Sequence, residues 1–161
     1  MEKLYFTEEQ KQILDMEKAY PNQGICNIGG RVTFSDKYDK TVVRAALRVA
    51  LAENEMLKVR VNRSYQPYVS TEEIEVGKWQ GTTLPTMKDL SIWLSRPFSF
   101  FDGPLYELCL FENEDVIELY VKVHHLLMDG YAIATWMRRY EEVYWEMMGG
   151  PQTDKVGGFL E

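Results

Sequence analysis

Residues 116–130 read VIELYVKVHHLLMDG, and this stretch decides the fold expected for the chain. Apolar side chains occupy every second position at Ile117, Leu119, Val121 and Val123. Alternation at period two is typical of a β-strand with one face in the core. Counting on by two places His125 at the end of the apolar face. The opposite face carries His124, Lys122, Tyr120 and Glu118.

The residues on either side predict a hairpin before this strand and a helix after it. Leu105–Phe111 is a second strand-like run, and the short polar connection 112–115 is suited to an antiparallel hairpin with Val116–His125. Beyond residue 130, aromatic side chains recur at the helical spacing: Trp136, Tyr140 and Tyr144. Such a stripe is typical of core packing, so we expect a long helix on the sheet that ends at Gly149-Gly150-Pro151.

The rest of the chain mixes helical and strand patterns. Helices are predicted over 7–18, where Thr7 and Gln10 form a capping box, from 39 to about 53, and over 86–95. Strands are predicted over 28–34 and 57–62, with 65–70 as a pairing partner of the latter and at most one short strand in 71–83. We therefore expect an α+β fold with a mixed or largely antiparallel sheet flanked by helices. One domain should cover residues 1–150, and 151–161 should be a tail or the start of a connection.

The two adjacent histidines are the candidate catalytic residues, and the chain has no other histidine. An imidazole at the end of an apolar stripe is partly desolvated, so we expect His125 to stay unprotonated near neutral pH and to be available as a general base. The carboxylate of Asp129 could return under the histidines or reach a basic residue of a neighbouring strand. Gly130 permits a positive φ or a close backbone approach at the turn.

Composition excludes several classes of function. The chain holds 18 Lys and Arg against 25 Asp and Glu, a formal charge of -7, which argues against a nucleic-acid partner. It lacks a run of 18 apolar residues and a basic, apolar leader, so we expect a soluble, cytoplasmic protein without membrane contact. Cys26 and Cys109 show no metal-binding spacing, so we expect two reduced cysteines and no metal site.

The motif His124-His125-Leu126-Leu127-Met128-Asp129-Gly130 resembles the HHxxxDG signature of the condensation domains of nonribosomal peptide synthetases, which are related to chloramphenicol acetyltransferase. Other segments resemble this family in the same order. Thr7 to Gln10 resembles its opening Ser-x-x-Gln, and Glu53 to Val61 resembles a worn form of its segment RHExLRTxF. Pro97-Phe98 resembles its Pro-Phe-Asp, and Gly103-Pro104-Leu105 resembles its Gly-Pro-Leu. In the worn segment only Glu55 and Leu57 match, and Lys58 stands at the position of the inner arginine.

The resemblance implies a chloramphenicol acetyltransferase-like lobe and a role for each motif residue. His125 would lie beside the acceptor amine and the thioester carbonyl as general base or orienting group, and His124 would support it through folding. Asp129 would pair with the inner arginine position, Lys58, or with Arg60 on the same strand face. Gly130 would let the pantetheine arm or the catalytic loop pass closely.

The resemblance also implies the substrates and partners. The thioester would be carried by phosphopantetheine on a carrier protein or by CoA, with no cofactor bound directly and no metal required. Family members have two lobes, and this chain has the length of one. Three hypotheses follow: the N-terminal lobe of an amide-forming condensation domain, a half-domain that self-associates as a homo-oligomer, and a non-catalytic module that binds a carrier protein or another partner.

Overall fold

Five strands form one sheet in the computed structural model, which describes residues 4–150 and the backbone of residues 157–160. Their order is β4 (Gly77–Lys78), β5 (Tyr106–Glu112), β6 (Val116–His124), β1 (Asn27–Ser35) and β7 (Gly157–Leu160). β6 pairs antiparallel with β5 and β1, β1 pairs antiparallel with β7, and β4 pairs parallel with β5. The predicted hairpin and the mixed sheet are therefore confirmed.

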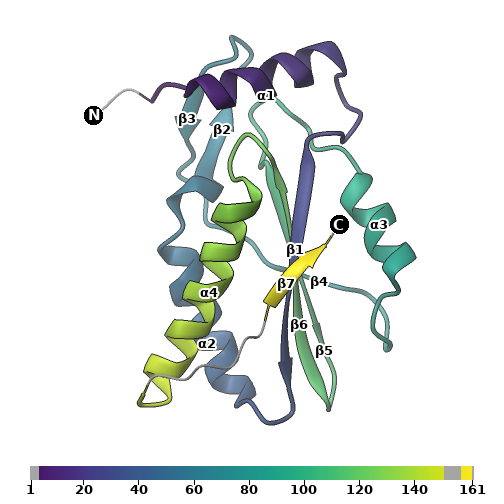
Figure 1. The fold of residues 1–161 in the computed structure, drawn as a ribbon, viewed down its shortest axis with the longest axis vertical. Helices are drawn as coiled ribbons and strands as arrows, with labels where there is room; N and C mark the ends of the chain where they lie inside the picture. The colour runs from purple at the N-terminus through teal and green to yellow at the C-terminus, as the bar shows by residue number, and fades with distance from the viewer. Residues whose placement is uncertain (1–3, 151–156, 161) are drawn as a thin grey trace.

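Helices cover both faces of this sheet and one of its ends (Figure 1). They are α1 (Glu8–Ala19), α2 (Lys40–Ala52), α3 (Met87–Ser95) and α4 (Gly130–Met147). α2 and α4 lie on one face, α3 lies on the other, and α1 crosses the end at which β6 stops (Figure 1). Local sequence sets where the helices begin, because Thr7, Asp39, Thr86 and Asp129 each accept a hydrogen bond from the first turn that they precede.

The core explains why β6 is buried on both faces. Its odd-numbered apolar residues join the main cluster, to which α4 contributes its buried aromatic stripe of Trp136, Tyr140 and Tyr144. Tyr120, on the opposite face, joins a second cluster with Trp93 of α3 and the partly buried Trp79. The predicted polar face of the strand is therefore covered by α3 instead of facing solvent. Lys122 is buried there, and its ammonium donates to the carbonyl of Trp93 at 3.0 Å.

Two segments differ from the sequence-based expectation. Leu57 and Lys58 belong to a 3-10 turn, η1 (Glu55–Lys58), so the strand β2 is only Val59–Val61; it pairs antiparallel with β3 (Pro67–Val69). The segment 151–161, expected to be a tail or the start of a connection, holds the strand β7 at Gly157–Leu160, while residues 151–156 and 161 lie outside the described part of the chain. β7 is defined by its pairing with β1 over Gly29 to Val32. Four residues are too few for the alternation of apolar and polar side chains to predict a strand or its partner.

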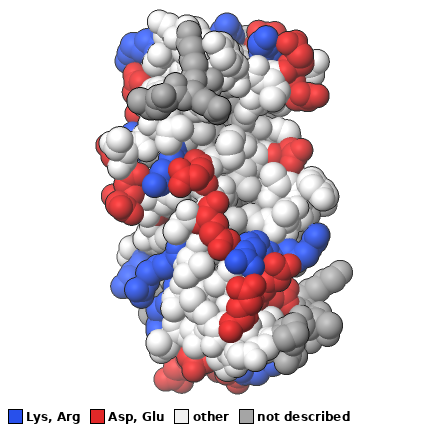
Figure 2. Space-filling model, turned by 90° about the vertical axis from the view of Figure 1, so that its left-hand side faces the viewer, with Lys and Arg blue, Asp and Glu red and all other residues white. Residues whose placement is uncertain are grey.

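Acidic and basic side chains are interspersed over the face shown in Figure 2. Arg139 of α4, for example, pairs with Glu53 at 2.8 Å and with Glu146 at 2.9 Å. Exposed pairs of this kind contribute little to stability. Of the helices in the described residues, none has the length and apolar character that crossing a membrane requires.

Candidate active site

The two histidines lie where β6 ends and a turn begins. His124 is the last residue of β6, and its backbone N–H donates to the carbonyl of Leu105 at 2.8 Å. The backbone N–H of His125 donates to the carbonyl of Cys26 at 2.7 Å. The N–H of Leu127 then donates to the carbonyl of His124 at 2.9 Å, which closes the turn. Main-chain hydrogen bonds thus fix the turn to the segments beside β6.

The His124 ring is buried and both of its nitrogens are in use. Its Nδ1 accepts a hydrogen bond from the N–H of Leu126 at 3.1 Å, so Nδ1 carries no proton. The neutral ring therefore has its proton on Nε2, which donates to Oε1 of Glu17 at 2.9 Å. Burial lowers the pKa of His124, and the hydrogen bond and charge of Glu17 oppose part of that shift. His124 is thus built as a neutral structural side chain, and the ring of Phe100 packs on it with centroids 5.3 Å apart.

The His125 ring is in a different situation. It is half-buried, and it makes no hydrogen bond or ion pair with any of the described residues. β6 stops at His124, so His125 lies in the turn that follows and not in the predicted strand. The three apolar residues that follow, Leu126 to Met128, are buried and anchor the turn. A partly sheltered imidazole without these partners has the geometry of a general base, and its catalytic role stays a prediction.

Asp129 supports the site as a helix cap. It is exposed, and its Oδ1 accepts a hydrogen bond from the N–H of Ala132 at 2.7 Å, which fixes the start of α4. Gly130 is the first residue of α4 and lies outside the positive-φ glycines of the described chain, so the turn does not use the left-handed conformation that glycine permits. The possibility of a close backbone approach at Gly130 remains a prediction.

The expected ion pair between Asp129 and Lys58 or Arg60 is not formed among the described residues. Arg60 instead binds the carboxylate of Glu72 at 2.9 Å and the carbonyl of Asp102 at 3.4 Å. Glu72 lies in the connection after β3, and β3 pairs antiparallel with β2, the strand that holds Arg60. The cation that the family resemblance implied for Asp129, Lys58 or Arg60, therefore does not pair with it among the described residues.

The helix α1 contributes two side chains to the histidine turn that sequence reasoning did not assign to the site. Gln10 donates from Nε2 to the carbonyl of Leu126 at 3.0 Å, while its Oε1 accepts the N–H of Thr7 in the capping box. Glu17 binds His124, as described above. These two α1 residues lie seven positions apart and therefore on one face of the helix. That shared face, with the buried Leu14 between them, was the available signal.

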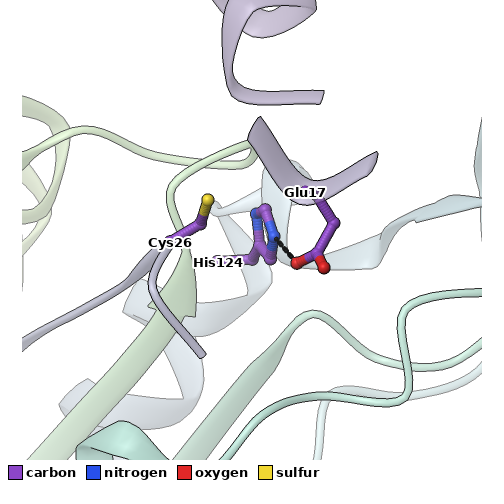
Figure 3. A group of neighbouring side chains, drawn as sticks. All are labelled: Glu17, Cys26 and His124. Carbon is purple, nitrogen blue, oxygen red and sulfur yellow. Dashed lines mark hydrogen bonds and ion pairs between the residues drawn. The ribbon is translucent and has the colours of Figure 1, made fainter. Parts of the chain in front are cut away.

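Glu17, Cys26 and His124 form a cluster whose ligand atoms lie within 4.8 Å of one another, which raises the question of a metal (Figure 3). The hydrogen bonds of the His124 ring argue against a metal ion here. Nε2 carries the proton because Nδ1 accepts from Leu126, so no lone pair faces the cluster. Burial and the charge of Glu17 also raise the pKa of the Cys26 thiol, which keeps it protonated, whereas a metal binds the thiolate.

Comparison with known proteins places this site in a family. The family model of the condensation domain matches residues 1–156. The chain belongs to the condensation-domain family. The motif-based resemblance is thereby confirmed, and so is the fold expected from it.

Two curated relatives of this condensation-domain chain come from Bacillus subtilis (strain 168). Surfactin synthase subunit 1 is 26% identical over 160 residues, which cover 91% of this chain and 4% of the relative. One of the plipastatin synthase proteins is 25% identical over 160 residues, which cover 88% of this chain and 6% of the relative. The chain therefore spans a small part of these two synthases.

Solved condensation domains share the fold. VibH, a nonribosomal peptide synthetase condensation enzyme, matches with a TM-score of 0.77 and 17% identity over 92% of this chain and 37% of its own. A mutant of the starter condensation domain of rhizomide synthetase RzmA matches with a TM-score of 0.74 and 20% identity over 96% of this chain and 41% of its own. Another mutant of that RzmA domain was solved in complex with C8-CoA and Leu-SNAC. The chain thus corresponds to less than half of a solved domain.

Proposed function

We propose that this chain is the N-terminal, motif-bearing lobe of a condensation domain that joins a thioester-activated acyl or aminoacyl donor to an acceptor amine. The observation that carries the proposal is the division of labour between the two histidines. His124 is buried with both nitrogens in use, whereas the adjacent His125 ring is half-buried and free of hydrogen bonds to the described residues. The His124 imidazole therefore stabilises the turn, and the His125 imidazole is available for chemistry.

The reaction requires one base at one position. The amine nitrogen attacks the thioester carbonyl, so that a C–N bond forms, the C–S bond breaks and a thiolate leaves. His125 accepts the proton that the nitrogen loses, or orients the amine for attack, and the departing thiolate takes up a proton. The donor would be presented by phosphopantetheine on a carrier protein or by CoA. Much of the rate must come from holding donor and acceptor together, which in this family is shared with a C-terminal lobe.

The test uses the 161-residue chain with C8-CoA and Leu-SNAC, the compounds bound by the RzmA mutant, and measures the amide product by mass spectrometry. We expect slow formation above the rate in buffer, and its loss in His125→Ala. Ile92→Ala, on the exposed side of α3, is the matched control and should keep the rate. Circular dichroism verifies the fold of each variant. A rate in the unaltered chain no higher than that of His125→Ala would overturn the proposal.

A non-catalytic half-domain that binds a carrier protein is the second candidate. The specific observation in its favour is that Asp129 lacks the expected cation among the described residues, since Arg60 is bound to Glu72. In that case a phosphopantetheine-bearing carrier protein would bind equally well to the unaltered chain and to His125→Ala, and no amide would form. Isothermal titration of the carrier protein into both chains separates this candidate from the first.

A further inference from the structure

The turn that bears His125 is held by α1 through two side chains that grip the same residue. Gln10 holds the carbonyl of Leu126 directly, at 3.0 Å. Glu17 acts through His124, whose Nδ1 holds the N–H of Leu126 at 3.1 Å. Both the donor and the acceptor of Leu126, the residue after His125, are therefore fixed by polar contacts that originate on one face of α1.

We infer that Glu17 is a positioning residue for His125, because its carboxylate sets the tautomer and orientation of His124 that hold the turn in place. This inference rests on the proposed function for its catalytic consequence. For the position of the turn itself, it rests on the contacts of Glu17, His124 and Leu126 alone.

In the hydrogen bond between His124 and Glu17, the ring must be the donor and the carboxylate the acceptor. An imidazole that accepts at Nδ1 must donate at Nε2, so the partner of Nε2 has to be an acceptor. The Glu17 carboxylate supplies that acceptor from a side chain that is only 12% exposed, next to a His124 ring that is 2% exposed. Without it, a buried N–H would lose its partner, and rotation of the ring toward another acceptor would release the N–H of Leu126. Glu17 thus holds the turn although it lies 107 residues away from His124 in sequence.

Glu17 also stabilises the segment that leads to Cys26. Its Oε2 accepts the N–H of Asn22 at 3.3 Å, just after the end of α1. The same loop then delivers the carbonyl of Cys26 to the N–H of His125. One carboxylate therefore contacts both chain segments that flank the His125 backbone, which favours a positioning function over simple packing.

Three variants separate positioning from general stability. Glu17→Met keeps a long helix-forming side chain and removes the acceptor. Glu17→Gln keeps an acceptor oxygen for Nε2 and removes the charge. Asp15→Met, at an exposed site of α1, is the matched control for charge and hydrophobicity. If Glu17→Met does not fold, Glu17→Ala takes its place with the same expectation.

The first measurement, amide hydrogen exchange by NMR, does not depend on activity. In Glu17→Met we expect the Leu126 amide to exchange about tenfold faster or more than in the unaltered chain, while buried amides of β6 such as Val121 keep their rates. Glu17→Gln and Asp15→Met should leave the Leu126 rate within about twofold of the unaltered chain. An unchanged Leu126 rate in Glu17→Met, or an equal acceleration in Asp15→Met, would overturn the inference.

The second measurement is the amide-forming assay with C8-CoA and Leu-SNAC. A displaced His125 should lower kcat in Glu17→Met by about tenfold to a hundredfold with little change in KM, and Glu17→Gln should restore kcat. A rise in KM alone, or a Glu17→Gln rate as low as that of Glu17→Met, would contradict the positioning role. If the unaltered chain forms no amide, the proposed function fails, and the Leu126 exchange rates still decide whether Glu17 holds the turn.

Discussion

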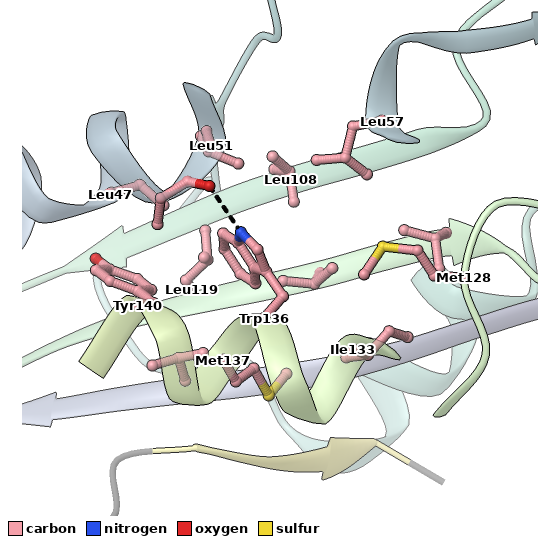
Figure 4. Close-up of a cluster of buried hydrophobic side chains, with 14 of the residues drawn as sticks. Leu47, Leu51, Leu57, Leu108, Leu119, Met128, Ile133, Trp136, Met137 and Tyr140 are labelled. Carbon is pink, nitrogen blue, oxygen red and sulfur yellow. Dashed lines mark hydrogen bonds between the residues drawn. The ribbon is translucent and has the colours of Figure 1, made fainter. Parts of the chain in front are cut away.

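Replacement of Trp136 by Phe tests how α4 is fixed over the sheet beneath the histidine turn. The indole Nε1–H donates to the carbonyl of Ala50 at 2.9 Å, and the ring is buried among side chains of α2 and β6 (Figure 4). Ala50 lies in the last turn of α2, where carbonyls lack helical partners. The N–H that would have served it, that of Asn54, is bonded to the carbonyl of Leu51 instead. Trp136 therefore supplies a donor that the backbone does not.

The magnitude follows from these contacts. A buried acceptor without a partner costs about 1–3 kcal/mol, and the smaller ring adds about 1–2 kcal/mol through lost contacts and a residual cavity. Tyr140→Phe, one helical turn further along α4, is the matched control. Its hydroxyl donates to the carbonyl of Val43 at 2.9 Å, but Val43 lies inside α2, where the N–H four residues on already serves that carbonyl. Tyr140→Phe should therefore cost only about 0.5–1.5 kcal/mol.

Urea unfolding followed by circular dichroism gives both free energies of unfolding. We expect Trp136→Phe to lower the free energy of unfolding by about 2–5 kcal/mol with an unchanged slope against urea, and by clearly more than Tyr140→Phe. Equal losses in the two variants would refute the assignment of Trp136 as the only buried donor for Ala50 within the described residues.

Two further predictions concern the motif itself. Asp129→Ala removes the cap of α4 and should lower the free energy of unfolding by about 1 kcal/mol, measured by urea unfolding, without the larger loss expected of a broken buried ion pair. The pKa of His124 is lower in the folded chain than in the unfolded one, so stability should fall as pH drops below the unfolded value of about 6.5 toward the folded pKa. Glu17 and Cys26 lie beside this ring, and the charge of His125 also lowers the pKa of His124. We therefore expect the fall in the free energy of unfolding between pH 7.5 and pH 5.5, measured by urea unfolding, to be smaller in His124→Asn than in the unaltered chain.

Much of the architecture could be predicted from local sequence. The capping box of Thr7 and Gln10, the alternation of residues 116–123 and the aromatic stripe of α4 each act over a few residues, and the structure confirms all three. The seven-residue motif also led to the correct family. The predicted strand was one residue too long, because β6 ends at His124 in a hydrogen-bonded turn that alternation does not describe.

The missed features depend on contacts between distant segments. No local pattern pairs Glu17 with His124, and only the fold places α1 across the end of β6. The salt bridge of Arg60 shows the same limit, because the family resemblance implied a pair with Asp129 and Arg60 binds Glu72 instead. Side-chain periodicity tells which face a residue occupies, whereas its partner depends on which element packs there.

Reaction of the folded chain with diethyl pyrocarbonate tests the central claim most directly, since this reagent acylates an accessible, unprotonated imidazole nitrogen and the chain has only two histidines. We expect one modified histidine near neutral pH, His125, identified by mass spectrometry of peptides. His124 should react only after unfolding, because it is buried with its Nδ1 and Nε2 both hydrogen-bonded. Modification of His124 in the folded chain at the rate of His125, or a His125 that does not react, would contradict the assignment of His125 as the available base.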